Sequence, residues 1–171
     1  MKALVVYYSL DGNTKAAAES AAEELGCDIL ALEPVKPIPE KGFKKMFVGG
    51  RQATFGEKPK LKKLVCDPGS YDLIIVGTPV WAGKCASPVW SFIDSCAVPE
   101  RIKALFTLSG GGDDSKCVRQ VEKRTGALKA RAALFDARNP KSSGNGEKLA
   151  RFIEAVRALI RGEAAPSPKN E

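Results

Sequence analysis

The sequence predicts an α/β protein whose parallel sheet is covered by helices on both faces. Short apolar runs rich in β-branched residues alternate along the chain with longer stretches of helical periodicity. Polar residues do not interrupt the apolar runs, which is typical of parallel strands that are buried on both sides. Because the chain has 171 residues, we expect one domain over residues 1–161 and a flexible tail over residues 162–171.

Two strands and one helix are predicted in the first part of the chain. The β-branched and aromatic run at residues 3–8 predicts the first strand. Residues 13–25 are rich in Ala and Glu, repeat apolar side chains at every fourth position and are followed by Gly26, which together predict a helix. Residues 28–33 predict a second strand, after which the chain enters a Pro- and Lys-rich stretch at 34–69.

Strands and helices alternate again in the second part of the chain. The predicted strands are residues 73–78, 102–108 and 128–135, and the predicted helices are residues 88–95, 114–124 and 147–161. The alternation of strands with helices favours parallel pairing. In such a sheet, ligands bind beyond the carboxyl ends of the strands, so the loops that follow the strands are the candidate site.

The positive charge of the chain is concentrated in one segment. The net charge is +7 and the isoelectric point is about 9.2. Residues 36–63 contain nine Lys and Arg residues and two Glu residues, so this segment alone accounts for the net charge. A basic segment of this kind can guide an acidic protein or a phosphorylated ligand, or it can be a solvated loop.

Several kinds of catalytic site are excluded by the composition. The chain contains no His, so it cannot build a Ser-His-Asp triad, a His-activated Cys or a His metal ligand. Its five Cys residues include no Cys-x-x-Cys pair, which argues against a zinc site and a disulfide framework. No apolar run is long enough to cross a membrane and the N-terminus does not resemble a signal sequence. We therefore expect a cytoplasmic protein whose chemistry comes from a cofactor.

A loop suited to phosphate follows the first predicted strand. It is rich in hydroxyl and small residues and opens onto the predicted helix, whose first N–H groups have no partner in the helix and carry partial positive charge. We expect these N–H groups and nearby polar side chains to hold a phosphate. The alternative is a capped turn with Asp11 or Asn13 as N-cap. The candidate residues are Ser9, Leu10, Asp11, Gly12, Asn13 and Thr14.

The segment around this loop resembles the signature of the flavodoxin family. The matching residues are Val5, Val6, Tyr7, Ser9, Gly12, Thr14 and Ala18, whereas Ala21 stands where the family prefers a larger aliphatic residue. The resemblance implies a flavodoxin-like three-layer, doubly wound sandwich with a five-stranded parallel sheet in the order 2-1-3-4-5. It also implies that FMN is the cofactor and that the basic stretch at 34–69 is an insertion in place of the family's second helix.

The same resemblance assigns the flavin ring to the loops after the third and fourth strands. The first loop is similar to the Thr-Pro-Val-Trp-x-Gly run of the family, and Trp81 is suited to stack on the flat flavin, with a core position as the alternative. The second loop is rich in Gly and has no Tyr where short-chain flavodoxins commonly place one, so we expect one flavin face to be open or to be filled by Phe43, Phe47, Trp90 or a substrate. The alternative for this loop is a glycine linker to the next helix. The candidate residues are Pro79, Val80, Trp81, Ala82 and Gly83 in the first loop, and Ser109, Gly110, Gly111, Gly112 and Asp113 in the second.

Three functions fit this sequence. We place first an electron carrier between protein partners, then an NAD(P)H-dependent flavin or quinone reductase, and last a flavodoxin-shaped binding module with weak or lost flavin. The basic segment favours an acidic redox partner that docks near Lys41, Lys44 and Lys45, or a phosphorylated nicotinamide. We expect no membrane or nucleic acid partner, no metal and no catalytic side chain, because the chemistry is that of the flavin. The protein is expected to be a monomer or a homodimer.

Overall fold

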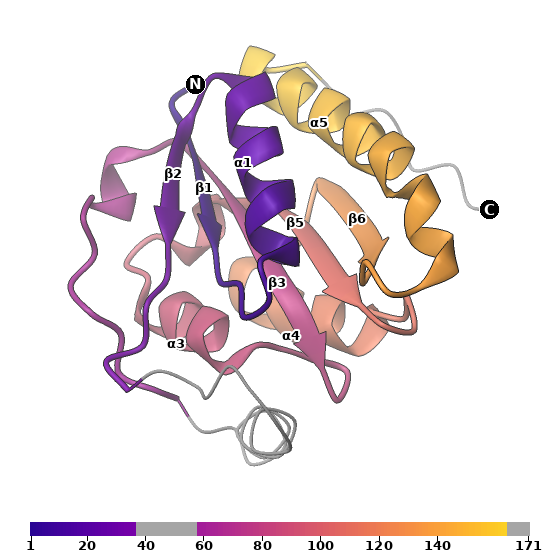
Figure 1. Ribbon diagram of the computed structural model, residues 1–171. Coiled ribbons are helices and arrows are strands. Elements are labelled where there is room, and N and C mark those ends of the chain that lie inside the picture. The colour runs from indigo at the N-terminus through magenta and orange to yellow at the C-terminus, as the bar shows by residue number, and fades with distance from the viewer. Residues whose placement is uncertain (37–57, 164–171) are drawn as a thin grey trace.

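The computed structural model describes residues 1–36 and 58–163, which form a three-layer α/β sandwich (Figure 1). The parallel strands are β1 (Ala3–Tyr7), β2 (Asp28–Ala31), β3 (Leu73–Trp81), β5 (Ile102–Ser109) and β6 (Ala130–Phe135), in the order β2-β1-β3-β5-β6. The short β4 (Lys84–Cys85) pairs antiparallel with the end of β3. The predicted fold class and the strand order 2-1-3-4-5 are confirmed, because β5 and β6 are the fourth and fifth parallel strands.

The helices cover the sheet from two sides. One face is covered by α1 (Asn13–Leu25) and α5 (Asn145–Arg161), and the other by α3 (Ser87–Ser95) and α4 (Ser115–Thr125) (Figure 1). Short 3₁₀ helices lie at Pro68–Ser70, Pro99–Arg101 and Pro140–Gly144. No helix within the two described ranges is both long enough and apolar enough to cross a membrane.

Strand β1 contributes side chains to two separate cores. Leu4 and Val6 join the core under α3 and α4, whereas Val5 and Tyr7 join the core under α1 and α5. Every residue of β1 is buried, as are residues 73–78 of β3. This burial on both sides is the reason that these strands are continuous apolar runs in the sequence.

Strands β3 and β5 require a Gly where a large ring crosses between them. Gly77 in β3 pairs with Phe106 in β5, and a Cβ atom at position 77 would lie 2.2 Å from the Cζ atom of Phe106. Phe106 also meets the ring of Phe152 in α5 edge-on, with 5.8 Å between the ring centroids. Phe106 therefore occupies the space that a side chain at position 77 would need.

Strand β3 extends beyond the predicted residues 73–78 because it forms a hairpin with β4. The turn consists of Ala82 and Gly83, whose φ angles are both positive, at 49° and 75°. Two-residue turns with two positive φ angles match the twist of paired strands, but this conformation strains any residue with a Cβ atom. The buried Thr78 hydroxyl supports the hairpin, because it accepts a hydrogen bond from the Ala86 N–H at 3.1 Å and donates one to the Pro79 carbonyl at 2.9 Å.

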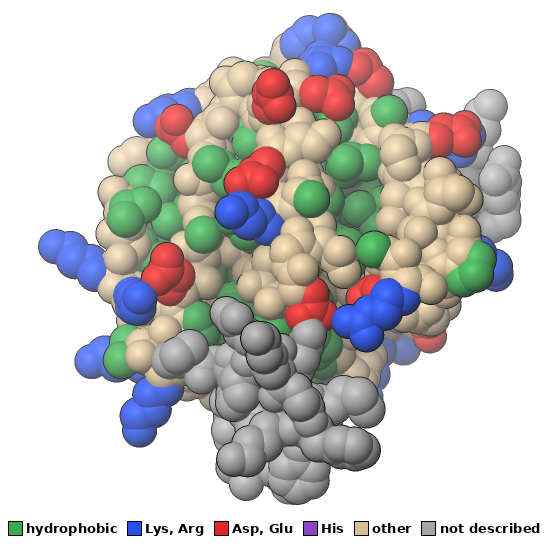
Figure 2. Space-filling view, viewed as in Figure 1, with side chains coloured by type: hydrophobic (Ala, Val, Ile, Leu, Met, Phe, Trp, Pro, Cys, Tyr) green, Lys and Arg blue, Asp and Glu red, His purple; other side chains and the backbone are tan. Residues whose placement is uncertain are grey.

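The described residues on either side of the basic segment pair with each other in a short stem. The Val35 N–H donates to the Lys60 carbonyl and the Lys62 N–H donates to the Glu33 carbonyl, both at 2.8 Å. Figure 2 shows Lys and Arg side chains projecting from this edge of the molecule, at the lower left. The predicted docking residues Lys41, Lys44 and Lys45, and residues 164–171 of the predicted tail, lie outside the described residues.

Asp94 connects the re-entering chain to the helical layer. This α3 residue has only 13% of its side chain exposed, and its carboxylate forms ion pairs with Lys58 and, at 2.8 Å, with Arg124 of α4. A carboxylate buried to this degree requires such partners. The pair with Lys58 attaches the chain at residue 58 to α3, on the face of the sheet that α3 and α4 cover.

Gly77→Ala is expected to lower the free energy of unfolding by about 3 kcal/mol, because the added methyl group would overlap Phe106 in a packed core. Gly146→Ala is the matched control, since no atom lies within 4 Å of a Cβ at that position in α5. Urea unfolding followed by circular dichroism measures both variants. A Gly77→Ala protein as stable as the wild type would contradict the packing described above.

The two turn residues are expected to respond to substitution in opposite directions. Gly83→Ala should lower the free energy of unfolding by about 1 kcal/mol, because Ala must then adopt a positive φ angle. Ala82→Gly should leave stability unchanged or raise it by up to about 1 kcal/mol, because relief of strain offsets the greater chain entropy of Gly. Thermal unfolding of both variants tests this contrast, and a larger loss for Ala82→Gly than for Gly83→Ala would refute the turn geometry.

Candidate functional site

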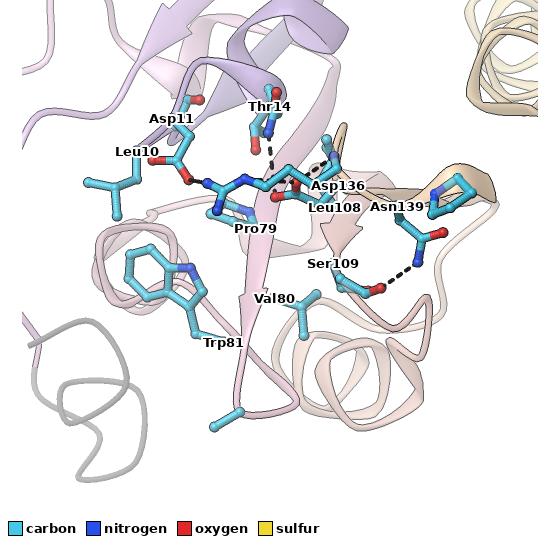
Figure 3. A pocket seen from close by; sticks show the side chains of 16 residues that line it. Leu10, Asp11, Thr14, Pro79, Val80, Trp81, Leu108, Ser109, Asp136 and Asn139 are labelled. Carbon is cyan, nitrogen blue, oxygen red and sulfur yellow. Dashed lines mark hydrogen bonds and ion pairs between the residues drawn. The ribbon is translucent and has the colours of Figure 1, made fainter. Parts of the chain in front are cut away.

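A cleft lies along the carboxyl ends of β1, β3, β5 and β6 (Figure 3). Its volume is about 890 Å³, which lies within the range of about 300–1,000 Å³ that is common for small-molecule sites. The lining residues are Ser9, Leu10, Asp11, Asn13, Thr14, Pro79, Val80, Trp81, Ala82, Leu108, Ser109, Gly110, Asp136, Arg138, Asn139 and Pro140. The cleft therefore lies where a ligand site is expected in an open parallel sheet.

The structure brings residues of all three predicted loops into this cleft. The predicted residues that line it are Ser9, Leu10, Asp11, Asn13, Thr14, Pro79, Val80, Trp81, Ala82, Ser109 and Gly110. The predicted residues that do not line it are Gly12, Gly83, Gly111, Gly112 and Asp113. Residues of the second group belong to the same loops and shape their turns.

The loop after β1 ends at the N-terminus of α1. Gly12 is the N-cap and has a φ angle of 86°, so neither Asp11 nor Asn13 takes that position. The Ser9 hydroxyl accepts a hydrogen bond from the Gly12 N–H at 3.1 Å, which closes the loop. The N–H groups in the first turn of a helix have no acceptor within the helix, and their partial positive charge favours an anion. This end of the cleft is therefore suited to a phosphate group.

Trp81 lies at the edge of the cleft, at the end of β3. Figure 3 shows its indole beside Leu10, on the side of the cleft that the hairpin forms. The Trp81 ring meets the ring of Tyr8 at an interplanar angle of 88°, with 5.9 Å between the centroids. Trp81 is only partly buried. The contact with Tyr8 thus orients an indole that still lines the cleft, where it can contact a flat ligand.

Hydrogen bonds within the loop after β5 limit its contribution to the cleft. The Ser109 hydroxyl accepts a hydrogen bond from the Gly112 N–H at 2.7 Å. Asp113 accepts one from the Ser115 N–H at 3.0 Å, and this bond lowers the pKa of the exposed Asp113 carboxyl. Ser109 and Gly110 face the cleft, whereas Gly112 and Asp113 turn the chain into α4.

A fourth loop, which is not among the predicted site residues, completes the cleft. It follows β6 and contributes Asp136, Arg138, Asn139 and Pro140 to the lining. The Asp136 N–H donates to the Ser109 carbonyl at 2.9 Å, and the Asn139 side-chain amide donates to the Gly110 carbonyl at 2.7 Å. The signal was available in the sequence, because this loop follows the fifth predicted strand and so emerges at the same edge of the sheet. Leu108, the last apolar residue of β5, was also missed.

The charged groups of the cleft lie at its phosphate-suited end. Among the described lining residues they are Asp11, Asp136 and Arg138. Arg138 lies with Nη2 3.8 Å from Oδ2 of Asp11 and with Nε 3.9 Å from Oδ1 of Asp136, and Figure 3 marks the ion pair at Asp11. Asn13 also contacts the Asp136 carboxylate, at 3.5 Å. The loops after β1 and β6 are therefore linked across the cleft.

Cys85 lies in β4, the second strand of the hairpin, and its thiol is buried. A hydrogen bond with Cys117 and burial of both side chains hold the pKa of Cys85 well above its ordinary value. Because the thiolate is the reactive form of Cys, the side chain acts as a small core residue. In the described ranges 1–36 and 58–163, no three Cys, Asp or Glu side chains gather where they could hold a metal ion.

Comparisons with known proteins agree with this geometry. An NAD(P)H dehydrogenase (quinone) of Syntrophus aciditrophicus (strain SB) is 30% identical to the chain over 129 residues, which are 67% of this chain and 63% of the relative. The match thus spans less than two thirds of that relative. A flavoprotein of Lactobacillus acidophilus NCFM, solved in complex with FMN, aligns with a TM-score of 0.61 and 21% identity, over 86% of this chain and 97% of that chain.

A second solved structure and a family model extend the comparison. A flavodoxin, WrbA-like protein of Agrobacterium tumefaciens aligns with a TM-score of 0.58 and 19% identity, over 95% of this chain and 98% of that chain. At these identities the two solved structures show a shared fold. The sequence model of the flavodoxin family matches residues 2–143, which is most of the chain. The strand order, the cleft and this match lead to one conclusion: the chain belongs to the flavodoxin family.

Proposed function

We propose that this protein binds FMN in the cleft and passes electrons from NAD(P)H to a quinone or flavin acceptor. The observation that carries the proposal is the convergence of a phosphate-suited loop and a partly buried Trp on one cleft at the carboxyl edge of the sheet. Membership of the flavodoxin family and the relative named NAD(P)H dehydrogenase (quinone) support it. The chemistry that FMN supplies when bound is the transfer of one or two electrons.

The residues of the cleft fit the two ends of FMN. The loop from Ser9 to Thr14 offers N–H groups and hydroxyls to the phosphate, as a helix N-terminus does for anions in general. Trp81 offers an indole to the ring system, with Pro79 and Val80 as apolar neighbours. Ser109 and Gly110 line the cleft after β5, where the Ser109 hydroxyl and the Gly110 N–H are suited to donate to the polar edge of the ring.

The scarcity of aromatic residues in the described lining of the cleft favours a reductase over a carrier. Trp81 is the only aromatic residue among the described residues that line the cleft, and the loop from Ser109 to Asp113 contains none. A volume of about 890 Å³ is near the upper end of the usual range for ligand sites, about 1,000 Å³. We infer that the second face of the flavin receives first a nicotinamide and then an acceptor.

An electron carrier is the second candidate. It is favoured by exposed Lys residues on the stem of the insertion, namely Lys36, Lys58, Lys60, Lys62 and Lys63. Positive charge at one edge increases the rate of encounter with an acidic redox partner. Lys41, Lys44 and Lys45, the predicted docking residues, belong to the same basic segment of the sequence. A flavodoxin-shaped module that binds flavin weakly is the third candidate.

Trp81→Ala is expected to raise the dissociation constants of FMN and riboflavin alike, by about ten-fold, because the loss of one stacking contact costs about 1–3 kcal/mol. The matched control is Trp90→Phe, which removes an indole from α3 outside the cleft and should leave both constants unchanged. Quenching of flavin fluorescence measures the six constants, for two flavins and each of the wild type and the two variants. If Trp81→Ala binds both flavins as tightly as the wild type, the assignment of Trp81 to the ring is wrong.

Rapid mixing of the FMN-loaded protein with NADPH or NADH under anaerobic conditions tests the reductase proposal. We expect the flavin absorbance to bleach within the time of a catalytic turnover, which is typically below about 1 s, and to return when a benzoquinone is added. Free FMN at the same concentration is the control for direct reaction with the nicotinamides. Bleaching no faster than that of free FMN would reject the reductase and leave the carrier.

A further inference from the structure

The loop after β6 carries the only cation of the cleft among the described lining residues. This residue is Arg138, whose side chain is 80% exposed. Its guanidinium reaches within 3.8 Å of Asp11, a residue of the loop that opens onto α1. A side chain from the last loop of the sheet therefore lies at the phosphate-suited end of the site, next to the first loop.

The present partners of Arg138 hold it only loosely. The separations of 3.8 Å from Asp11 and 3.9 Å from Asp136 exceed the length of a charge-assisted hydrogen bond, which is about 2.7–2.9 Å. Ion pairs of such exposed side chains contribute little to stability. The guanidinium thus keeps its N–H donors available for a stronger acceptor, and its planar fork matches the oxygens of a phosphate.

Hydrogen bonds hold the backbone around Arg138 in place, whereas the Arg138 side chain is exposed. The Arg138 N–H donates to Oδ1 of Asp136 at 3.0 Å, and the Asn139 N–H donates to the Asp136 carbonyl at 2.8 Å. The Asn139 side-chain amide donates to the Gly110 carbonyl. At the start of the loop, the Asn145 side chain accepts from the Phe135 N–H at 2.9 Å and donates to the Phe135 carbonyl at 2.8 Å. A fixed loop that carries one exposed Arg is suited to present this side chain to a ligand.

Two carboxylates line the same end of the cleft as Arg138. The side chains of Asp11 and Asp136 are 30% and 31% exposed, and both residues line the cleft. A phosphate monoester brings a further charge of about −1.5 to −2 at neutral pH. Arg138 is the one cation among the described lining residues that can offset the repulsion between Asp136 and this phosphate.

We propose that Arg138 is a specificity residue for the phosphate group of the flavin, so that this protein selects FMN over riboflavin through its fourth loop. This inference rests on the proposed binding of FMN. In the bound state the guanidinium turns from the two carboxylates toward the phosphate, and Asp136 keeps its hydrogen bond to the Arg138 backbone. Selectivity then comes from a residue outside the three loops that the sequence indicated.

The test compares the dissociation constants of FMN and riboflavin for the full chain and its Arg138→Ala variant. We expect Arg138→Ala to raise the constant for FMN about ten-fold at low ionic strength, as for loss of a charged hydrogen bond, and to leave riboflavin unchanged. Salt should weaken FMN binding by the wild type more than by the variant. Arg131→Ala, which removes an exposed Arg of β6 outside the cleft lining, is the charge-matched control and should change neither constant.

A second variant separates a direct charge effect from a loss of loop structure. Asp136→Asn removes one repelling charge and keeps an oxygen that can accept the Arg138 N–H, so FMN should bind several-fold more tightly while riboflavin binding stays the same. Equal effects of Arg138→Ala on FMN and riboflavin, or no effect on either, would overturn the inference while leaving the proposed function intact. A wild-type protein that binds neither flavin would instead overturn the proposed function itself.

Discussion

Burial of β3 on both faces is the constraint on which the rest of the structure depends. The strand pairs with β1 on one side and β5 on the other, and residues 73–78 are buried throughout. Two packed helical layers are therefore required, and Phe106 can fill the layer toward α5 only because Gly77 has no side chain. Within β3, only the three residues after Thr78 are partly exposed, and these residues line the cleft.

The same strand connects the core to the site. Thr78 is buried, yet its hydroxyl bonds the Ala86 N–H and the Pro79 carbonyl, so it fixes the start of the hairpin that carries Trp81. Tyr8, at the end of β1, then orients the Trp81 ring. The position of the indole thus depends on the packed sheet through the hydrogen bonds of Thr78 and the contact with Tyr8. This is how a rigid scaffold presents loop residues to a ligand.

The sequence allowed prediction of those features that depend on neighbours along the chain. Strand order followed from the family resemblance, and α1 was predicted over its observed range because Ala-rich periodicity ends at Gly26. The positive φ of Ala82 could not be predicted, since only pairing of β3 with β4 imposes it. The loop after β6 could have been assigned to the cleft from its place after the fifth predicted strand. The contact of Arg138 with Asp11 could not, because it spans 127 positions of sequence and no local pattern marks it.

The distribution of charge separates cofactor binding from the approach of a partner. The described residues that line the cleft carry one Arg and two Asp, a net charge of −1, whereas the whole chain carries +7. Among the described residues, the excess of positive charge thus lies outside the lining of the cleft. Positive charge lies instead at the edge beside β2, where Lys58 is attached to α3 through Asp94 (Figure 2). An anionic partner or nicotinamide would be attracted to that edge first, while selection of the flavin depends on one Arg inside the cleft.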